Sequence, residues 1–184
     1  MKHLSAYSID FVSFARITGA WLLFLLLGSN VQAQSEQFDY SQLKFMPLDS
    51  YYRANQIDVV AADNCDLYFE VYTWLGTRYC YGGRTRNGID CSDFASVIYE
   101  KIYNRNIGGT AGDIFNKCTP VDTSELREGD LLFFKISRKG ISHMAVYLQN
   151  RRFAHATVHG GVMVNSLDER YYARSFYKAG RLKD

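Results

Sequence analysis

Cys91 is the residue in this sequence whose type and position best suit nucleophilic chemistry. It stands where a glycine-punctuated loop that starts at Gly82 runs into an amphipathic segment after Ile89. A helix start leaves backbone N–H groups unpaired and carries the positive end of the helix dipole. Both features stabilise a thiolate, which is the nucleophilic form of cysteine. We therefore expect Cys91 to be a catalytic nucleophile, although free cysteines are more often buried and inert.

Two histidines supply the groups that a cysteine nucleophile needs. A general base must take the thiol proton and return it to the leaving amine, and a second group must orient that base. His143 opens one expected strand and His155 lies inside the next, so a tight hairpin places them on neighbouring strands. The pattern predicts a Cys–His–His line with His143 as base and His155 as its orienting partner. His159 stands in a glycine-rich turn and is expected to face solvent.

A tyrosine near the nucleophile is the fourth candidate. In a chain with 14 tyrosines, each one is by default a core or surface aromatic. The phenol of Tyr79 could instead donate a hydrogen bond to a developing oxyanion, beside the backbone N–H of Cys91. One such donor is worth about 2.7–4 kcal/mol in the transition state. The residues themselves do not choose Tyr79 over Tyr81 for this role.

The first half of the chain is expected to be helical where it is regular. Asp63 and Asn64 suit the cap of a helix over about 65–75, in which apolar residues recur at helical spacing, and Gly76 fits its end. A second helix should follow Ile89, and a shorter one is expected near 48–54. Residues 104–119 contain three glycines and are expected to form a loop.

The second half of the chain predicts short strands separated by turns. The apolar run 131–134 suits a strand buried on both faces, and further strands are expected at 143–148, 153–157, 162–164 and 175–180. Polar or glycine-containing turns are expected at 127–130, 137–140, 149–152 and 159–161. Helices followed by a strand meander are typical of an α+β fold with an antiparallel sheet, here of about five to six strands.

The N-terminus has the pattern of an export signal. A mildly basic leader precedes the apolar run 17–28, and Val31-Gln-Ala33 offers small residues at the −3 and −1 positions of a cleavage site. The run is short for a spanning helix, so we expect a cleaved signal peptide over residues 1–33, with an uncleaved anchor as the alternative. Residues 34–63 would then be an N-terminal extension and residues 64–184 the catalytic domain. The expected location is the periplasm, the cell envelope or outside the cell, without stable membrane insertion.

Composition and cysteine spacing limit the partners. A chain of 184 residues suits one domain with a real core, and a net charge of +2 without Lys/Arg runs does not favour nucleic acid. We expect a monomer. With Cys91 free, the cysteines at 65, 80 and 118 allow at most one disulfide, for which Cys65–Cys118 is one option. None of the spacings matches a metal site, so no metal is predicted.

Five sequence blocks resemble those of the NlpC/P60 family of cell-wall cysteine peptidases. They occupy residues 79–83, 90–94, 127–134, 142–148 and 153–156, in the family's order and at similar spacings. One Asp-Cys-Ser triplet would be weak evidence, whereas five ordered blocks are strong. The resemblance covers about residue 67 to the C-terminus. It implies a papain-like α+β fold in which the nucleophile begins a helix packed on an antiparallel sheet.

The resemblance also implies a reaction and a set of residues. It implies hydrolysis of the peptidoglycan stem peptide, typically between D-glutamate and a diamino acid, without a metal or an organic cofactor. Matched by position, the catalytic residues would be Cys91, His143, His155 and Tyr79. The expected substrate-binding residues are Asp90, Ser92, Asp93 and Arg84. Asp93 replaces the family's usual glycine, and its carboxylate would oppose thiolate formation if it faced Cys91.

Two other functions stay open at this point. The first is a non-catalytic protein that binds the cell wall with the same fold, against which the intact Cys91, His143 and His155 argue. The second is an amidase or acyltransferase that uses the same three residues for a different reaction.

Overall fold

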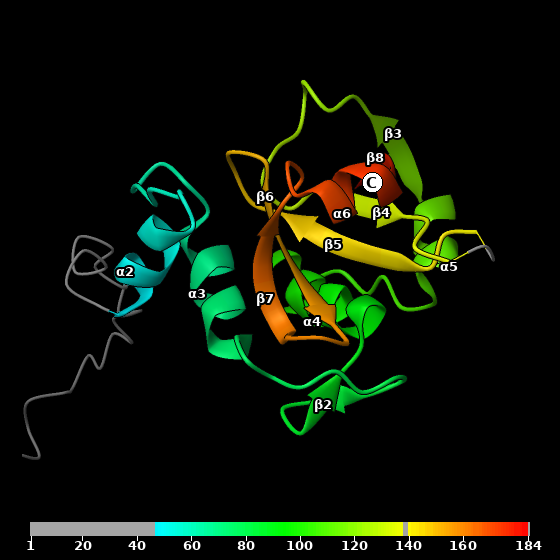
Figure 1. Cartoon of the computed structure of the whole chain (residues 1–184), viewed down its shortest axis with the longest axis horizontal. Coiled ribbons are helices and arrows are strands. Elements are labelled where there is room, and N and C mark those ends of the chain that lie inside the picture. The colour runs from blue at the N-terminus through cyan, green and yellow to red at the C-terminus, as the bar shows by residue number, and fades with distance from the viewer. Residues whose placement is uncertain (1–46, 138–139, 184) are drawn as a thin grey trace, which may run out of the picture. The chain divides into compact units, whose positions relative to one another are not determined.

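A six-stranded antiparallel sheet organises the computed structural model, which describes residues 47–137 and 140–183 (Figure 1). The strands are β3 (Cys118–Val121), β4 (Leu131–Phe134), β5 (His143–Tyr147), β6 (Arg152–Thr157), β7 (Gly161–Ser166) and β8 (Phe176–Leu182). Their order in the sheet is β3-β8-β4-β5-β6-β7, and every neighbouring pair is antiparallel. The predicted α+β class, with a sheet of five to six strands, is confirmed.

Tight turns explain why β5, β6 and β7 lie side by side. Asn150 and Arg151 both have positive φ values, 51° and 61°, which suits the two-residue turns that join antiparallel strands. Ala154 consequently pairs with Val146 of β5 and with Val164 of β7. This register fixes where His143 on β5 and His155 on β6 lie.

The sheet is covered on both faces, as the apolar run of β4 predicts. Leu131 and Phe133 belong to a large core cluster, whereas Leu132 and Phe134 belong to a smaller one. The large cluster includes residues of α2 (Pro47–Ala54), α3 (Cys65–Trp74) and α4 (Cys91–Tyr103), and the small one includes Tyr172 of α6 (Arg170–Ser175). All four residues of β4 are fully buried, so the prediction of a strand buried on both faces is confirmed.

The helix that begins at Cys91 is held by its apolar face. Phe94 and Ile98 lie one turn apart on α4, and both are fully buried in the large core cluster. Burying one such side chain stabilises the fold by about 1.5–3 kcal/mol. The core therefore anchors the helix whose first residue is the candidate nucleophile.

Several elements differ from the expectation. Within the segment expected to be a loop, the structure has α5 (Ala111–Asn116) and the start of β3. The Thr110 hydroxyl accepts from the Asp113 N–H while the Asp113 carboxylate accepts from the Thr110 N–H, which is a capping box that outweighs the nearby glycines. The short hairpin of β1 (Arg84–Thr85) and β2 (Gly88–Ile89) and the helix α6 were also not expected.

The segment before α3 shares the main core. Leu48 and Tyr52 of α2 are buried in the large cluster, and the Tyr52 hydroxyl donates to the carbonyl of Tyr68 at 2.8 Å. The predicted signal peptide at residues 1–33 lies outside the described residues. No helix in the described ranges is long and apolar enough to cross a bilayer. All four cysteines are unbonded, so the Cys65–Cys118 bridge that the sequence allows does not form here.

Candidate active site

The start of α4 is built around Asp90. Its carboxylate caps the helix by accepting from the Asp93 N–H at 2.8 Å, and it also accepts from the Ser92 hydroxyl at 2.9 Å. Its second oxygen accepts from the N–H of Gly82 at 2.9 Å, which ties the preceding loop to the helix. Asp90 and Ser92, both predicted to bind substrate, thus have structural partners that hold Cys91 in place.

The loop before the helix needs glycine at a point of close backbone approach. A Cβ atom on Gly83 would lie 2.5 Å from the carbonyl oxygen of Gly88, which is closer than real Cβ contacts. The Gly83 carbonyl accepts from the Asp90 N–H at 3.0 Å. The glycines in this part of the sequence therefore allow the loop to fold tightly against the helix start.

Cys91 lies at the junction of α4 and β5. Its side chain is nearly buried, with 8% of the residue exposed, and its sulfur contacts the backbone N–H of Met144, the residue after His143. Burial raises the pKa of the Cys91 thiol to about 11, with a smaller contribution from Asp90, while the N–H groups of Met144, Ser92 and Cys91 itself act in the opposite direction. The expectation of an acidified thiol is therefore wrong for the resting protein, because burial outweighs the helix start.

The two histidines form a direct contact. His143 Nε2 lies 2.7 Å from His155 Nδ1, and both side chains are buried. They share one face of the sheet with Phe153 and Tyr172, which pack against the ring of His155 at centroid distances of 5.1 and 5.2 Å. Burial lowers the pKa of both imidazoles well below the usual range, and the proximity of His155 lowers that of His143 further. Both histidines are therefore neutral at pH 7.

Sequence reasoning missed the groups that continue this line. His155 Nε2 lies 2.8 Å from Asn165 Oδ1, and Asn165 Nδ2 donates to both carboxylate oxygens of Glu169 at 3.0 and 2.9 Å. The signal that could have found Asn165 is strand alternation, because a polar residue inside β7 must find a partner when the sheet is covered on both faces. Glu169 carries no such signal, since it precedes a helix that was not expected.

Tyr79 and Tyr81 both line the cavity that contains Cys91, but they differ in burial. Tyr79 is partly buried, and burial followed by the proximity of Cys91 raises its pKa to about 12, so its phenol stays a hydrogen-bond donor at neutral pH. Tyr81 is 88% exposed. Burial therefore favours Tyr79 over Tyr81 for the oxyanion role that the sequence left open between them.

Asp93 and Arg84 contact each other. Arg84 donates to Asp93 at 3.1 Å and to Glu100 at 2.7 Å. This ion pair partly neutralises the carboxylate that replaces the family's usual glycine. Of the nearby carboxylates, it is Asp90 that contributes to the raised pKa of Cys91. Asp93 thus lines the cavity that contains Cys91, whereas Arg84 is not among the described residues that line it and is engaged by two carboxylates.

Two neighbouring cavities contain the candidate residues. The cysteine cavity, of about 670 Å³, is lined by Cys91 and by the carboxyl groups of Asp90, Asp93 and Asp113. The histidine cavity, of about 350 Å³, contains His143 and the exposed His159. Tyr79, Ser137 and Ser142 line both. The two cavities thus form one continuous groove, along which a chain could pass the sulfur and the imidazole. In the described ranges no group of three His, Cys, Asp or Glu side chains is placed to hold a metal ion.

Comparison with known proteins agrees with this geometry. The NlpC/P60 family profile matches residues 76–181, more than half of the chain. The chain belongs to the NlpC/P60 family of cysteine peptidases. It is 36% identical over 130 residues to the Probable endopeptidase NlpC of Escherichia coli strain K12. The aligned part covers 70% of this chain and 82% of that protein. It is 32% identical over 109 residues to the Murein DD-endopeptidase MepS/Murein LD-carboxypeptidase of the same strain, which covers 59% and 57% of the two chains.

Solved NlpC/P60 structures share the fold. The NlpC/P60 domain of the peptidoglycan hydrolase SagA superposes with a TM-score of 0.56 at 29% identity, covering 65% of this chain and 99% of that domain. Another relative, the Probable endopeptidase NlpC homolog of Haemophilus influenzae, is 36% identical over 109 residues, and this chain covers 57% of its length. The family match begins at residue 76, so α2 and α3 precede the part that the NlpC/P60 profile describes.

Proposed function

We propose that this NlpC/P60 protein is a cysteine endopeptidase that cleaves peptide bonds in the peptidoglycan stem, between D-glutamate and a diamino acid. The observation that carries the proposal is the placement of the Cys91 sulfur beside the first residues of β5, where the His143–His155 pair begins. The relatives named as murein endopeptidases support the substrate class. The same relatives support a location in the cell envelope, to which the N-terminal signal would direct the chain.

In the first half of the reaction, His143 acts as base through Nδ1, since its Nε2 is engaged by His155. The thiol proton passes to Nδ1 as the sulfur attacks the carbonyl carbon of the scissile bond. The Cys91 N–H and the Tyr79 hydroxyl donate to the oxyanion of the tetrahedral intermediate. When the C–N bond breaks, the proton on His143 goes to the leaving amine, and a thioester remains on Cys91.

In the second half, water replaces the amine. His143 takes a proton from water as the water oxygen attacks the thioester carbon. The C–S bond breaks, the sulfur regains a proton from His143, and the new carboxylic acid leaves. The residues return to their starting protonation states, so this sequence of steps uses neither a metal nor an organic cofactor.

The resting protonation states suit a general-base route. A thiol with a raised pKa and imidazoles with lowered pKa values start as a neutral pair rather than as a thiolate and an imidazolium. Proton transfer then accompanies attack on the carbonyl, at the stage where the oxyanion donors begin to act. The helix start contributes at this stage, by supplying N–H groups to the developing charge.

A digest of purified peptidoglycan tests the proposal. Wild-type protein should release fragments whose masses show new D-glutamate carboxyl ends and new diamino-acid amino ends. Cys91→Ala should fold normally and release none, whereas Cys80→Ala, which removes an exposed thiol outside the proposed machinery, should match the wild type. Fragments cut at another bond would favour an amidase, an acyltransferase or a different stem specificity. Hydrolysis by folded Cys91→Ala would exclude the proposed nucleophile.

A further inference from the structure

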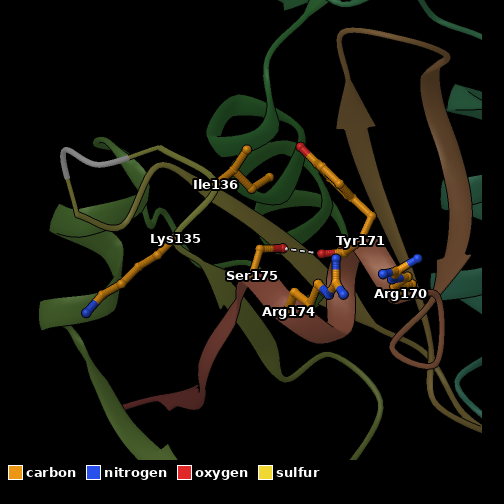
Figure 2. Close-up of a pocket in the computed structure, with 6 residues that line it drawn as sticks. All are labelled: Lys135, Ile136, Arg170, Tyr171, Arg174 and Ser175. Atoms are coloured by element: carbon orange, nitrogen blue, oxygen red, sulfur yellow. Dashed lines mark hydrogen bonds between the residues drawn. The ribbon is translucent and has the colours of Figure 1, made fainter.

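A basic cavity adjoins the groove on the side away from Cys91. It has a volume of about 520 Å³ and is lined by Lys135, Ile136, Arg170, Tyr171, Arg174 and Ser175 (Figure 2). Ile136 and Tyr171 also line the histidine cavity, so the basic cavity continues the groove past His143. A peptide bound across the catalytic residues could therefore extend into it.

The positive charges in this cavity are not neutralised by the protein. None of the described residues that line it is Asp or Glu, and neither Arg170 nor Arg174 has an acidic partner in the described part of the chain. The two arginines lie four residues apart on α6, a spacing at which like charges destabilise a helix. The adjacent acids are occupied elsewhere, since Asp168 pairs with Arg151 and Glu169 accepts from Asn165.

The walls of the cavity are suited to a peptide rather than to a free ion. Tyr171 is 56% exposed and stands with Ile136 at the boundary with the histidine cavity. Figure 2 shows Arg170 and Arg174 extending from α6, with Lys135 on a separate segment. The Lys135 ammonium lies 3.5 Å from the centre of the Tyr177 ring, so that cation already has an aromatic partner. Arg170 and Arg174 are therefore the cations of the cavity that are left for a ligand.

The groove as a whole is electrically polarised. The described residues of the cysteine cavity include three aspartates and no lysine or arginine. The basic cavity has one lysine and two arginines and no Asp or Glu among its described residues. We propose that Arg170 and Arg174 bind a carboxylate of the peptide that occupies the groove, an inference that rests on the proposed peptidase function. Guanidinium groups bind carboxylates with two parallel hydrogen bonds, which an amide cannot reproduce. The carboxylate-binding site would select the charged form of the stem peptide.

Titration calorimetry with the full chain tests this site without requiring turnover. In a Cys91→Ala background, a synthetic stem peptide with free carboxylates should bind with a Kd about tenfold lower than its fully amidated form. Arg170→Gln/Arg174→Gln should remove that difference. Arg53→Gln/Lys101→Gln loses the same two charges at exposed positions that line none of the three cavities, and should preserve the difference.

Two results would overturn the inference. One is equal affinity for the two peptides, or binding of neither, in the parent Cys91→Ala protein. The other is a preference for the free carboxylate that survives Arg170→Gln/Arg174→Gln. Peptidoglycan cleavage by the wild type is measured separately, so loss of the carboxylate preference and loss of the peptidase function remain distinguishable.

A second inference comes from the hydrogen bonds behind His155. A carboxylate only accepts, so the contacts of Glu169 with Asn165 Nδ2 direct Asn165 Oδ1 toward His155 Nε2. An oxygen acceptor at 2.8 Å requires that Nε2 carry the proton. The Tyr172 hydroxyl, 3.3 Å from Nε2, donates to the same Oδ1 at 3.5 Å and so does not compete for the Nε2 lone pair. His155 Nδ1 is then an acceptor.

The proton position on His155 in turn determines the proton position on His143, the proposed base. His155 Nδ1 accepts from His143 Nε2–H at 2.7 Å, which leaves Nδ1 of His143 without a proton. We infer that Asn165 and Glu169 are positioning residues that set the tautomers of both histidines. Through them, the nitrogen of His143 that must take the thiol proton is kept basic.

Nuclear magnetic resonance of the histidine side chains reads the tautomers directly. In the wild type, long-range ¹H–¹⁵N spectra should show both His143 and His155 protonated on Nε2. In Asn165→Leu the Tyr172 hydroxyl can donate to His155 Nε2, so the proton should move to Nδ1, with kcat falling about tenfold or more and KM unchanged. Asn165→Gln keeps both the acceptor for His155 and the donor for Glu169, and should retain the wild-type tautomers.

The inference fails if wild-type His155 carries its proton on Nδ1. It also fails if folded Asn165→Leu keeps the Nε2–H tautomers. If Asn165 had only a structural role, Asn165→Leu would change the stability of the protein without moving these resonances. The tautomer measurement does not depend on which stem bond is cut.

Discussion

Cys91 and Cys118 are alike as thiols and differ in their surroundings. Each is the first residue of an element, each is less than 10% exposed, and burial raises the pKa of each to about 11. The Cys118 thiol donates to the carbonyl of Ile114 at 3.3 Å within a closed core, whereas Cys91 borders a groove and the strand of His143. The two thiols have similar pKa values, so they differ in access and in the neighbouring histidine strand rather than in acidity.

The base should make the largest difference between the two cysteines. His143→Gln removes the proposed base, so that Cys91 would then resemble Cys118 in lacking one. We expect kcat on a stem-peptide substrate to fall by about 10²–10⁴-fold with little change in KM. His159→Gln, an exposed histidine of the same groove, is the matched control and should stay within twofold. Equal losses in both variants would contradict the assignment of His143.

Tyr79→Phe tests the proposed oxyanion donor. This donor is a second difference between the surroundings of Cys91 and those of Cys118. Loss of one donor should reduce kcat by about 10²–10³-fold, corresponding to about 2.7–4 kcal/mol. Tyr81→Phe removes a hydroxyl from an exposed ring of the same cavity and should reduce the rate far less than Tyr79→Phe. A rate for Tyr79→Phe close to wild type would assign the oxyanion to backbone N–H groups alone.

The pH dependence of alkylation compares the two thiols directly. Below a pKa of about 11 the thiolate fraction rises tenfold per pH unit, so iodoacetamide should modify Cys91 faster at each step from pH 7 to pH 10. Peptide mapping should give the same slope for Cys118, whose pKa is raised to a similar value. A plateau for Cys91 that begins below pH 7 would instead reveal a resting thiolate–imidazolium pair.

The smallest expected effect is on stability, and it comes from the histidine pair. Burial lowers the pKa of His143 and His155 in the folded state, so below the unfolded value of about 6.5 the unfolded chain binds more protons. The free energy of unfolding should therefore fall as pH drops from 6.5 to 5, by at most about 1.4 kcal/mol per pH unit for each histidine. Urea unfolding of His155→Gln should show a shallower pH dependence than the wild type, and an unchanged dependence would contradict this origin of the effect.

The sequence predicted the parts that local signals determine. Asn64 accepts from the Leu67 N–H as a helix cap, the run 131–134 is buried on both faces, and the turn at Asn150 joins the two histidine strands. In these cases a cap, a periodicity or a turn specifies the element without help from distant residues. The pairing of His143 with His155 followed from that hairpin.

The remaining features depend on the packed structure. The acidity expected for Cys91 followed from its helix start, but burial by the sheet has the larger effect on its pKa. Asn165 and Glu169 enter the site only because β7 pairs with β6 and α6 follows it. The basic cavity likewise combines α6 with the end of β4, and no pattern along the chain indicates that approach.

Affinity labelling at pH 7 tests whether the groove and its histidines make Cys91 the nucleophile. A stem peptide that ends in a chloromethyl ketone should modify Cys91 at a rate far above that of Cys118, and excess unmodified stem peptide should prevent it. Peptide mapping by mass spectrometry identifies the labelled residue. Labelling of Cys91 should be prevented by the unmodified stem peptide and should be much slower in His143→Gln. Unprotected labelling, or labelling of Cys91 no faster than of Cys118, would contradict it.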